Sequence, residues 1–239
     1  MKSKFLIVFS LFACALNAQT IADKKVTWDY PVKPGMEKWK EFNLTVEMVN
    51  ACQIPEAVLS KLSTDDLTEI CLQYPLFICV YAVNVLNNGV ENLYNEFNGI
   101  RELYSRKDAA SCLIKRYIQK VQSFSFLDEE HSDYTKGAFM NSATNLEILL
   151  SQIAQYDTEN CKEILKCLVY GYEEKLKYKN YFGYGFVTNF YSRAQVIRKM
   201  DNTFIDALPD KELNPIISSG RSDEKTFSLI DEISYKLIK

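Results

Sequence analysis

The amino-acid sequence predicts an all-α fold: an irregular multi-helix array, or a stack of helical pairs resembling an α-solenoid, behind an extended N-terminal arm. Three observations support this prediction. Apolar residues recur at the spacing of helix faces through most of the chain. Residue types that begin and end helices separate these amphipathic stretches. No Asn-Gly or Asp-Gly pair lies between two alternating strands, so the usual signal of a β-hairpin is missing.

The first element is a predicted export signal over residues 1–18. Lys2 and Lys4 give it a basic start, and the apolar run over 5–16 is too short to cross a bilayer comfortably. Small residues follow this run, so we expect cleavage after Ala18 and an exported, periplasmic or extracellular protein.

Two alternatives concern the limits of the mature chain. The stretch "LFAC" resembles a lipobox, in which Cys14 would be lipidated and would anchor the protein at the cell envelope. Residues 19–239 are expected to form a single helical domain, with a sub-boundary near 125–135 as the alternative. No other apolar run is long enough to span a membrane, so we expect no transmembrane segment in the mature chain.

The mature chain starts with an extended arm and continues as a series of helices. Pro31 and Pro34 disfavour helix in the residues before them. Ser63, with Asp66 three residues later, indicates the N-cap of a helix that Pro75 ends. We expect helices over residues 55–62, 63–74, 75–86, 90–97, 100–106, 109–124, 133–155, 159–178, 186–200 and 224–238, with a loop-like linker over 208–222.

One of these elements depends on a choice between competing patterns. Residues 75–86 have the composition of a buried strand, but helices flank them, so we interpret them as a buried helix broken by Asn87-Asn88-Gly89. We expect Asp108 to cap the helix that follows it. Gly183 and Gly185 are expected in the turn before the helix over 186–200.

Charge disfavours nucleic acid as a partner. The chain has 28 Lys and Arg against 31 Asp and Glu, and the export signal holds two of the lysines and no acid. The mature chain is therefore acidic and has no concentrated block of basic residues, whereas phosphate binding needs a positive surface.

The cysteines outside the export signal are Cys52, Cys71, Cys79, Cys112, Cys161 and Cys167. An even number in an exported protein is compatible with disulfides. Cys71 with Cys79, and Cys161 with Cys167, would be roughly 12 and 9 Å apart along a helix, too far for a bond within one helix. Buried thiols that act as small apolar residues are the preferred interpretation, and bridges between helices the alternative.

The stretch "KNYFGYGFVTNFY" over residues 179–191 is unusually rich in aromatic residues. It lacks the third glycine of a dinucleotide-binding fingerprint and follows a helix, so it predicts no nucleotide site. Tyr178, Tyr181 and Tyr184 are candidate ligand-binding residues that would form a stacking platform for a sugar or a peptide. The alternative is that these rings belong to the core.

Catalytic and metal-binding motifs are missing from the sequence. His131 is the one histidine, and it cannot form a relay with the adjacent Ser132 and Asp133 because neighbouring side chains on a helix point apart. The sequence has no C-x-x-C, P-loop, EF-hand or G-x-S-x-G pattern. It therefore indicates no catalytic residue, no metal and no cofactor, and a non-enzymatic protein is the favoured interpretation.

Four segments carry a resemblance to a known family: "WDYPVKPGMEKW", "ACQIPEAVLSKLSTDDL", "CLQYPL" and "FNGIRELYSRKDA". In these, the N-terminal half of the mature chain resembles a family of exported bacterial all-helical proteins with no assigned function. The resemblance implies export and a helical fold, and it implies no substrate. Some relatives continue into a domain with an Asn-Cys-His motif typical of cysteine hydrolases; this chain has no such motif.

Three functions follow as hypotheses. The first is an interaction or scaffold module that binds a protein or peptide along a helical groove. The second is a periplasmic hydrolase that acts on peptide or glycan through carboxylates or His131. The third is a lipid-anchored component of a surface uptake system, which depends on Cys14.

Overall fold

The computed structural model describes residues 28–201 and 224–239, which form helices and connecting loops without a β-strand. The all-α prediction is therefore confirmed for this part of the chain, while a solenoid-like arrangement is not confirmed. None of the helices in the two ranges combines the length and the apolar character of a membrane span. The predicted export signal, Cys14 and the linker over 208–222 lie outside the described residues.

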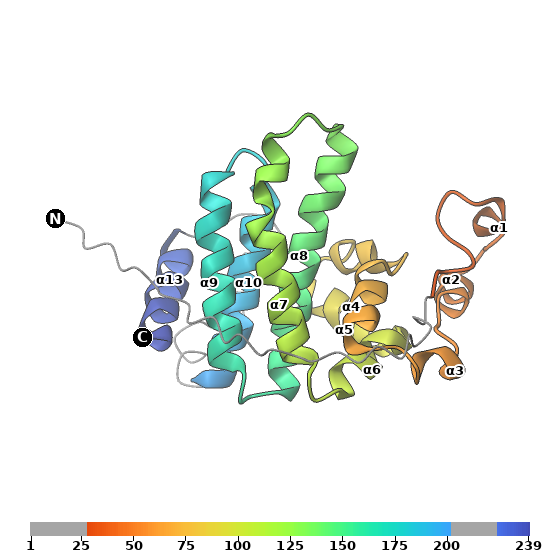
Figure 1. Cartoon of the computed structure of the whole chain (residues 1–239), viewed down its shortest axis with the longest axis horizontal. Helices are drawn as coiled ribbons and strands as arrows, with labels where there is room; N and C mark the ends of the chain where they lie inside the picture. The colour runs from red at the N-terminus through yellow and green to blue at the C-terminus, as the bar shows by residue number, and fades with distance from the viewer. Residues whose placement is uncertain (1–27, 202–223) are drawn as a thin grey trace, which may run out of the picture.

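Short helices form the first part of the described chain and longer helices the rest (Figure 1). In chain order the α-helices are α1 (Glu37–Lys40), α2 (Thr45–Ala51), α3 (Glu56–Leu59), α4 (Thr64–Leu72), α5 (Leu86–Glu96), α6 (Asn98–Ser105), α7 (Ala109–Gln122), α8 (Asp133–Tyr156), α9 (Cys161–Lys177), α10 (Gly183–Met200) and α13 (Glu224–Ile238). Two 3-10 helices, η1 (Phe77–Tyr81) and η2 (Phe124–Asp128), precede α5 and α8.

Four long helices, α7 to α10, pack side by side and form the main body, with α13 on the outer side of α9 and α10 (Figure 1). The apolar face of α8 is fully buried from Ala143 to Ala154, including Leu146, Leu149 and Leu150. Each buried leucine stabilises the fold by about 1.5–3 kcal/mol relative to an exposed one. One hydrophobic cluster includes residues from α4 to α10 and from α13, so these helices share a core.

A group of charged and polar side chains lies inside this core. The Lys175 ammonium is 2.7 Å from the Glu147 carboxylate, and both side chains are fully buried. Tyr117 donates a hydrogen bond to Glu147, and Asn189 donates another over 2.8 Å. The Lys175 ammonium also donates to the Gly185 carbonyl over 3.0 Å. Buried charges are tolerated when they are paired and hydrogen-bonded, which is the situation of Glu147 and Lys175.

The C-terminal helix α13 is held by a buried arginine of α10. Arg193 is fully buried; its Nη2 lies 2.6 Å from Asp231 Oδ1 and its Nε donates to Ser234 Oγ over 3.0 Å. The rings of Phe190 and Phe227 stack beside it with centroids 4.1 Å apart. The position of α13 on the bundle is therefore fixed by both charge pairing and aromatic contact.

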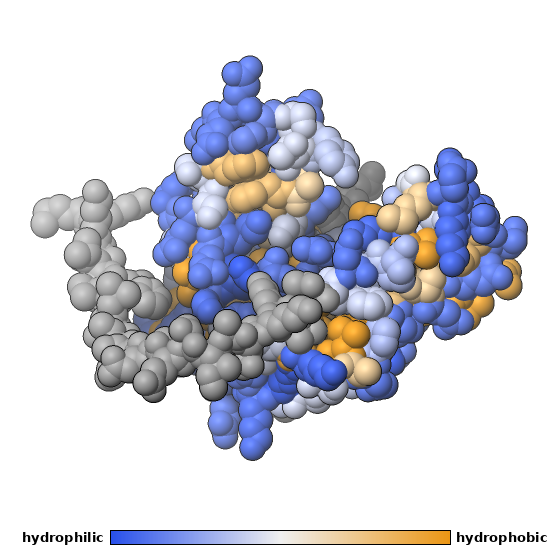
Figure 2. Space-filling view, turned by 45° about the vertical axis from the view of Figure 1, so that its right-hand side comes forward, coloured by the Kyte–Doolittle hydropathy of each residue, from blue (hydrophilic) through white to orange (hydrophobic). Residues whose placement is uncertain are grey.

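The N-terminal arm extends away from the bundle, at the right of Figure 1. Helices α1 and α2 have no buried residues, and Leu44 and Val46 are more than half exposed. The arm is attached at Tyr30, which is buried and donates a hydrogen bond to the Ile70 carbonyl over 2.9 Å. On the face that Figure 2 shows, hydrophobic side chains form separate patches among hydrophilic ones.

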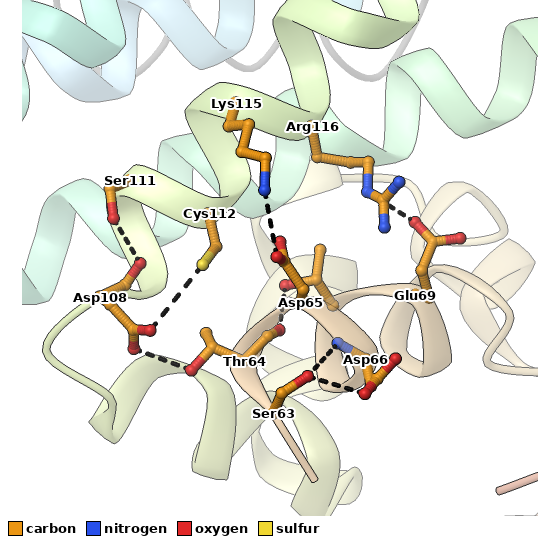
Figure 3. A network of polar contacts seen from close by, with 11 residues as sticks. Ser63, Thr64, Asp65, Asp66, Glu69, Asp108, Ser111, Cys112, Lys115 and Arg116 are labelled. Carbon is orange, nitrogen blue, oxygen red and sulfur yellow. Dashed lines mark hydrogen bonds and ion pairs between the residues drawn. The ribbon is translucent and has the colours of Figure 1, made fainter. Parts of the chain in front are cut away.

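Helices α4 and α7 are joined at the surface by a network of polar contacts (Figure 3). Lys115 of α7 pairs with Asp65 of α4 over 3.1 Å, and Arg116 pairs with Glu69 over 2.9 Å. Ser63 caps α4 by accepting a hydrogen bond from the Asp66 amide, as predicted. We define this network as the α4–α7 seam.

The prediction of a buried helix over 75–86 is wrong. Residues 77–81 form η1, residues 82–85 form bends, and Ile78 is 63% exposed. The expected break at Asn87-Asn88-Gly89 is wrong too, because α5 begins at Leu86 and runs through it. A Cβ atom on Gly89 would lie 2.2 Å from the Val80 carbonyl oxygen. This glycine therefore allows η1 to pack against α5 and does not end a helix.

Two smaller expectations also need correction. Helix α10 begins at Gly183 and includes Gly185, so these glycines do not form the turn that precedes it. A Cβ atom on Gly185 would lie 3.3 Å from the Phe182 ring, so this glycine lets the ring pack closely against α10. Asp108 occupies the N-cap position of α7 without a capping hydrogen bond; its carboxylate accepts one from Thr64 over 2.8 Å. The other predicted helices correspond to observed ones, with shifts at their ends.

Candidate functional site

A cleft of about 380 Å³ opens between α5, α8 and α10. Its residues lie at helical spacings within each helix, which brings each set to one face. Carboxamide side chains predominate among them, with two cations and one carboxylate. The lining residues are Asn87 and Glu91 from α5, Gln152 and Gln155 from α8, and Gln195, Arg198 and Lys199 from α10.

A hydrogen-bonded chain fixes the α5 side of the cleft. The buried Tyr191 of α10 donates from its hydroxyl to Asn87 Oδ1 over 3.1 Å. The Asn87 amide in turn donates to Glu91 Oε1 over 2.7 Å. Burial raises the pKa of the Tyr191 hydroxyl well above its ordinary value. Tyr191 therefore remains a neutral donor that orients Asn87, and through it Glu91, toward the cleft.

Three tyrosines, from α5, α6 and α8, stack on one another. The ring centroids of Tyr94 and Tyr156 are 5.5 Å apart, and those of Tyr104 and Tyr156 are 5.6 Å apart, with the rings near parallel. Tyr94 follows Glu91 by three residues on α5, and Tyr156 follows Gln152 by four on α8, so each ring is on the helix face that supplies lining residues. Tyr156 is 52% exposed and offers the accessible ring of the group.

The hydroxyl groups of Tyr104 and Tyr156 are poor candidates for a general base or a nucleophile, because they resist deprotonation. Burial and the neighbouring Tyr94 hydroxyl raise the pKa of Tyr156 to about 12. Burial also raises the pKa of Tyr104 well above its usual range, and the Tyr104 hydroxyl donates to the Leu149 carbonyl over 3.3 Å. Tyr104 and Tyr156 therefore supply ring surface, with hydroxyls that stay protonated near neutral pH.

The cleft is equipped for recognition by hydrogen bonding and charge. Each carboxamide offers an acceptor and two donors, and the Arg198 guanidinium offers a planar set of donors that matches a carboxylate. Lys199 is exposed and adds a second positive charge beside Arg198. Glu91 is the one acidic group among the lining residues. A polar ligand with amide groups and an acidic group would match this lining.

The tyrosines singled out in the sequence lie elsewhere. Tyr178 follows α9 and meets Phe124 edge to face, with ring centroids 6.0 Å apart. The Tyr181 ring lies 5.3 Å from the Lys136 ammonium. Both rings are half-buried, and neither lines the cleft. Tyr184 is in the first turn of α10, and its side chain lies outside the described residues. The stacking platform stays a prediction.

The environment of His131 offers no relay to the adjacent serine. The His131 ring stacks on Phe126 with centroids 3.9 Å apart, and its Nε2 is 3.1 Å from Glu129. The Ser132 hydroxyl caps α8 by accepting a hydrogen bond from the Thr135 amide.

The six cysteines of the described chain are all free thiols. Four are buried, Cys112 is half-buried and Cys79 is exposed. Burial raises the pKa of Cys52 to about 11 and raises that of Cys71 and Cys167 further. These thiols stay protonated, and a protonated thiol is a poor nucleophile. The interpretation as small apolar residues is confirmed for the buried four.

Metal-binding geometry is missing from the part of the chain that the structure describes, where no group of three or more His, Cys, Asp or Glu side chains is placed to hold an ion. Comparison with protein-family models, with curated proteins and with solved structures finds no match for this chain.

Sequence reasoning missed the cleft because its residues come from three separate helices. A signal was nevertheless present. Gln152 and Gln155 place uncharged amides one turn apart on α8, and Gln195 places another on α10, one turn before Arg198. Uncharged amides on two helix faces that pack together indicate a polar groove, although the sequence does not show that these two helices meet.

Proposed function

We propose that this protein is an exported binding module that holds a segment of acidic peptide in the cleft between α5, α8 and α10. The observation that carries the proposal is the lining of this cleft, in which carboxamides stand beside Arg198 and Lys199. Its volume of about 380 Å³ is within the range of ligand sites, about 300–1,000 Å³.

The carboxamides support a peptide as the ligand. A peptide backbone alternates N–H donors with C=O acceptors, and each Asn or Gln side chain can pair with one of each. Gln152 and Gln155 come from α8 and Gln195 faces them from α10, so amide groups line two walls of the cleft. An extended segment lying between these walls would find partners on both sides.

The charges support an acidic peptide. Arg198 and Lys199 bring two positive charges to the cleft, while Glu91 brings one negative charge and already accepts a hydrogen bond from Asn87. A ligand carboxylate, either a side chain or a C-terminus, would restore the balance and could pair with the Arg198 guanidinium through two parallel hydrogen bonds. The half-exposed Tyr156 ring would take an apolar or aromatic side chain of the same segment.

The place of action is part of the proposal. The basic start and the apolar run of residues 1–18 support export, as does the resemblance of the N-terminal half to exported helical proteins. Mass spectrometry of the mature protein would decide how the chain is processed. A free or cyclised Gln19 start supports cleavage after Ala18, whereas a diacylglycerol mass on Cys14 would contradict it and support the lipid anchor.

Selection from a random peptide library tests the proposed ligand. We expect peptides that bind the wild-type protein to be enriched in Asp and Glu. Binding should fall about tenfold or more in Arg198→Gln, which corresponds to about 1.4 kcal/mol and is typical of a lost charge-assisted contact. Lys38→Gln is the matched control, because Lys38 is an exposed cation on α1, in the arm away from the bundle.

Two results would contradict the proposal. One is a selected set without acidic enrichment, or with equal affinity for wild type and Arg198→Gln. The other is saturable binding of glycans on an array together with no peptide binding. Far-ultraviolet circular dichroism of both variants shows whether a loss of binding comes from unfolding, because α10 is central to the bundle.

A further inference from the structure

A second cleft lies on the other side of α8, between α4, α7 and α8, with a volume of about 220 Å³. Arg116, Gln119 and Lys120 of α7 line it together with Ser142 of α8 and Glu69 of α4. None of these residues lines the cleft of the proposed function. Two cations therefore share this small space with one carboxylate.

The two cations differ in the group that each one contacts: Arg116 pairs with a carboxylate, and Lys120 lies over an aromatic ring. The Arg116 Nε atom lies 2.9 Å from Glu69 Oε1, which leaves the terminal guanidinium nitrogens free of that contact (Figure 3). The Lys120 ammonium is held 4.3 Å from the centre of the Phe139 ring, and no carboxylate within 4.0 Å of it is found among the described residues. An aromatic face stabilises a cation less than a carboxylate does. Among the described residues, Lys120 is thus a partly buried charge without a directly paired carboxylate.

Desolvation makes this arrangement costly without a ligand. Burial is the largest influence and lowers the pKa of Lys120. The negative charge of Glu69 raises it in part, and the like charge of Arg116 lowers it by a smaller amount. The groups facing Lys120 are Arg116 on its own helix, Glu69 from α4 and the Phe139 ring from α8. An added negative charge in this cleft would offset the repulsion between the two cations.

We propose that this second cleft binds a small tetrahedral oxyanion, namely phosphate or sulfate, either free or as the ester of a larger ligand. The Lys120 ammonium and the terminal nitrogens of Arg116 would supply charge, and Gln119 and Ser142 would supply neutral donors. A volume of about 220 Å³ corresponds to about seven waters at ~30 Å³ each, so an ion of five heavy atoms fits. Tetrahedral oxyanions match this set because they accept several hydrogen bonds at once.

Isothermal titration calorimetry of the full chain tests this site with three probes at constant ionic strength: inorganic phosphate, sulfate and glycerol phosphate. We expect saturable binding of at least one probe and a loss of about tenfold or more in Lys120→Gln. Lys38→Gln is the matched control, since it removes the same charge from the exposed α1, and it should bind as the wild type does. Stronger binding of glycerol phosphate than of inorganic phosphate would identify an ester as the natural ligand class.

A second variant keeps the test informative if Lys120→Gln loses stability. Arg116→Gln leaves the Lys120 contact with Phe139 intact and should also lose about tenfold or more in affinity. The pKa of Lys120, followed by nuclear magnetic resonance of its side chain, should rise when the probe binds. Absence of saturable binding for all three probes, or unchanged affinity in both variants, would overturn the proposal. Because peptide binding depends on Arg198, failure at one cleft leaves the result at the other intact.

Discussion

Helix α7 belongs to two polar regions that differ in their contact with water. On its inner face, Tyr117 joins the buried group around Glu147 and Lys175, where both charged side chains have no exposed surface. On its outer face, Lys115 pairs with Asp65 in the α4–α7 seam, and both side chains are about half exposed. The same helix thus carries a desolvated network on one side and a hydrated one on the other.

The difference shows that a short ion-pair distance does not by itself indicate a strong contribution to stability. Exposed pairs gain about 0–1 kcal/mol because water screens them and long side chains must be ordered. Buried pairs are retained at a desolvation cost, so breaking one leaves an uncompensated charge and costs about 3–5 kcal/mol. We therefore expect the interior network to control stability and the seam to contribute little.

The largest expected effect comes from Lys175→Met. This change leaves the Glu147 carboxylate buried without its cation and should lower the free energy of unfolding by about 3–5 kcal/mol, as measured by urea denaturation. Lys177→Met is the control on the same helix, because Lys177 is exposed and pairs with Glu174 one turn earlier; its effect should stay below about 0.5 kcal/mol. Equal effects of the two variants would show that burial does not distinguish these pairs.

An intermediate effect is expected at Gly171 of α9. A Cβ atom there would lie 1.9 Å from the Tyr117 hydroxyl oxygen, so Gly171→Ala must displace Tyr117 from Glu147. Overpacking of this kind costs about 1–3 kcal/mol in unfolding free energy. Gly137→Ala in α8 is the control, since its Cβ would meet nothing within 4 Å, and it should stabilise the helix by up to about 1 kcal/mol. Thermal unfolding of both variants would separate the cost of a steric clash from the gain in helix propensity. An unchanged melting temperature in Gly171→Ala would contradict the tight contact between Gly171 and Tyr117.

The smallest effect is expected in the seam. Lys115→Gln removes the pair with Asp65 and should lower the free energy of unfolding by less than about 1 kcal/mol. The remaining effect should disappear at high salt, because exposed charges are screened within about 10 Å at 0.1 M ionic strength. Urea denaturation at low and high salt measures both. A loss comparable with that of Lys175→Met would refute the comparison between the two regions.

Much of the fold was predictable because local signals agree with tertiary packing. The apolar spacing in α8, α9 and α13 and the Ser63 cap of α4 are properties of neighbouring residues, and the structure has them where expected. The prediction for residues 75–86 was wrong because local signals there do not agree with tertiary packing. Their composition suits several conformations, and the choice is made by the Val80 carbonyl packing against Gly89, a contact that periodicity does not show.

The sites were harder to predict because their chemistry arises from packing between helices. The candidate tyrosines were chosen for local abundance of rings, whereas the cleft gathers amides from three helices. The sequence does indicate that Glu147 is buried, because it is the one acid within the apolar run "LEILL". The identity of its partner, Lys175 on the next helix, depends on the register between α8 and α9, which the sequence does not reveal.

The buried Arg193 has a consequence for how the chain reaches its final form. Its guanidinium belongs to α10, yet its carboxylate and hydroxyl partners, Asp231 and Ser234, belong to α13. A chain that emerges from a ribosome N-terminus first therefore carries the Arg193 charge without these partners until α13 has been made. Packing of α10 into the interior of the bundle is complete only when α13 docks beside it.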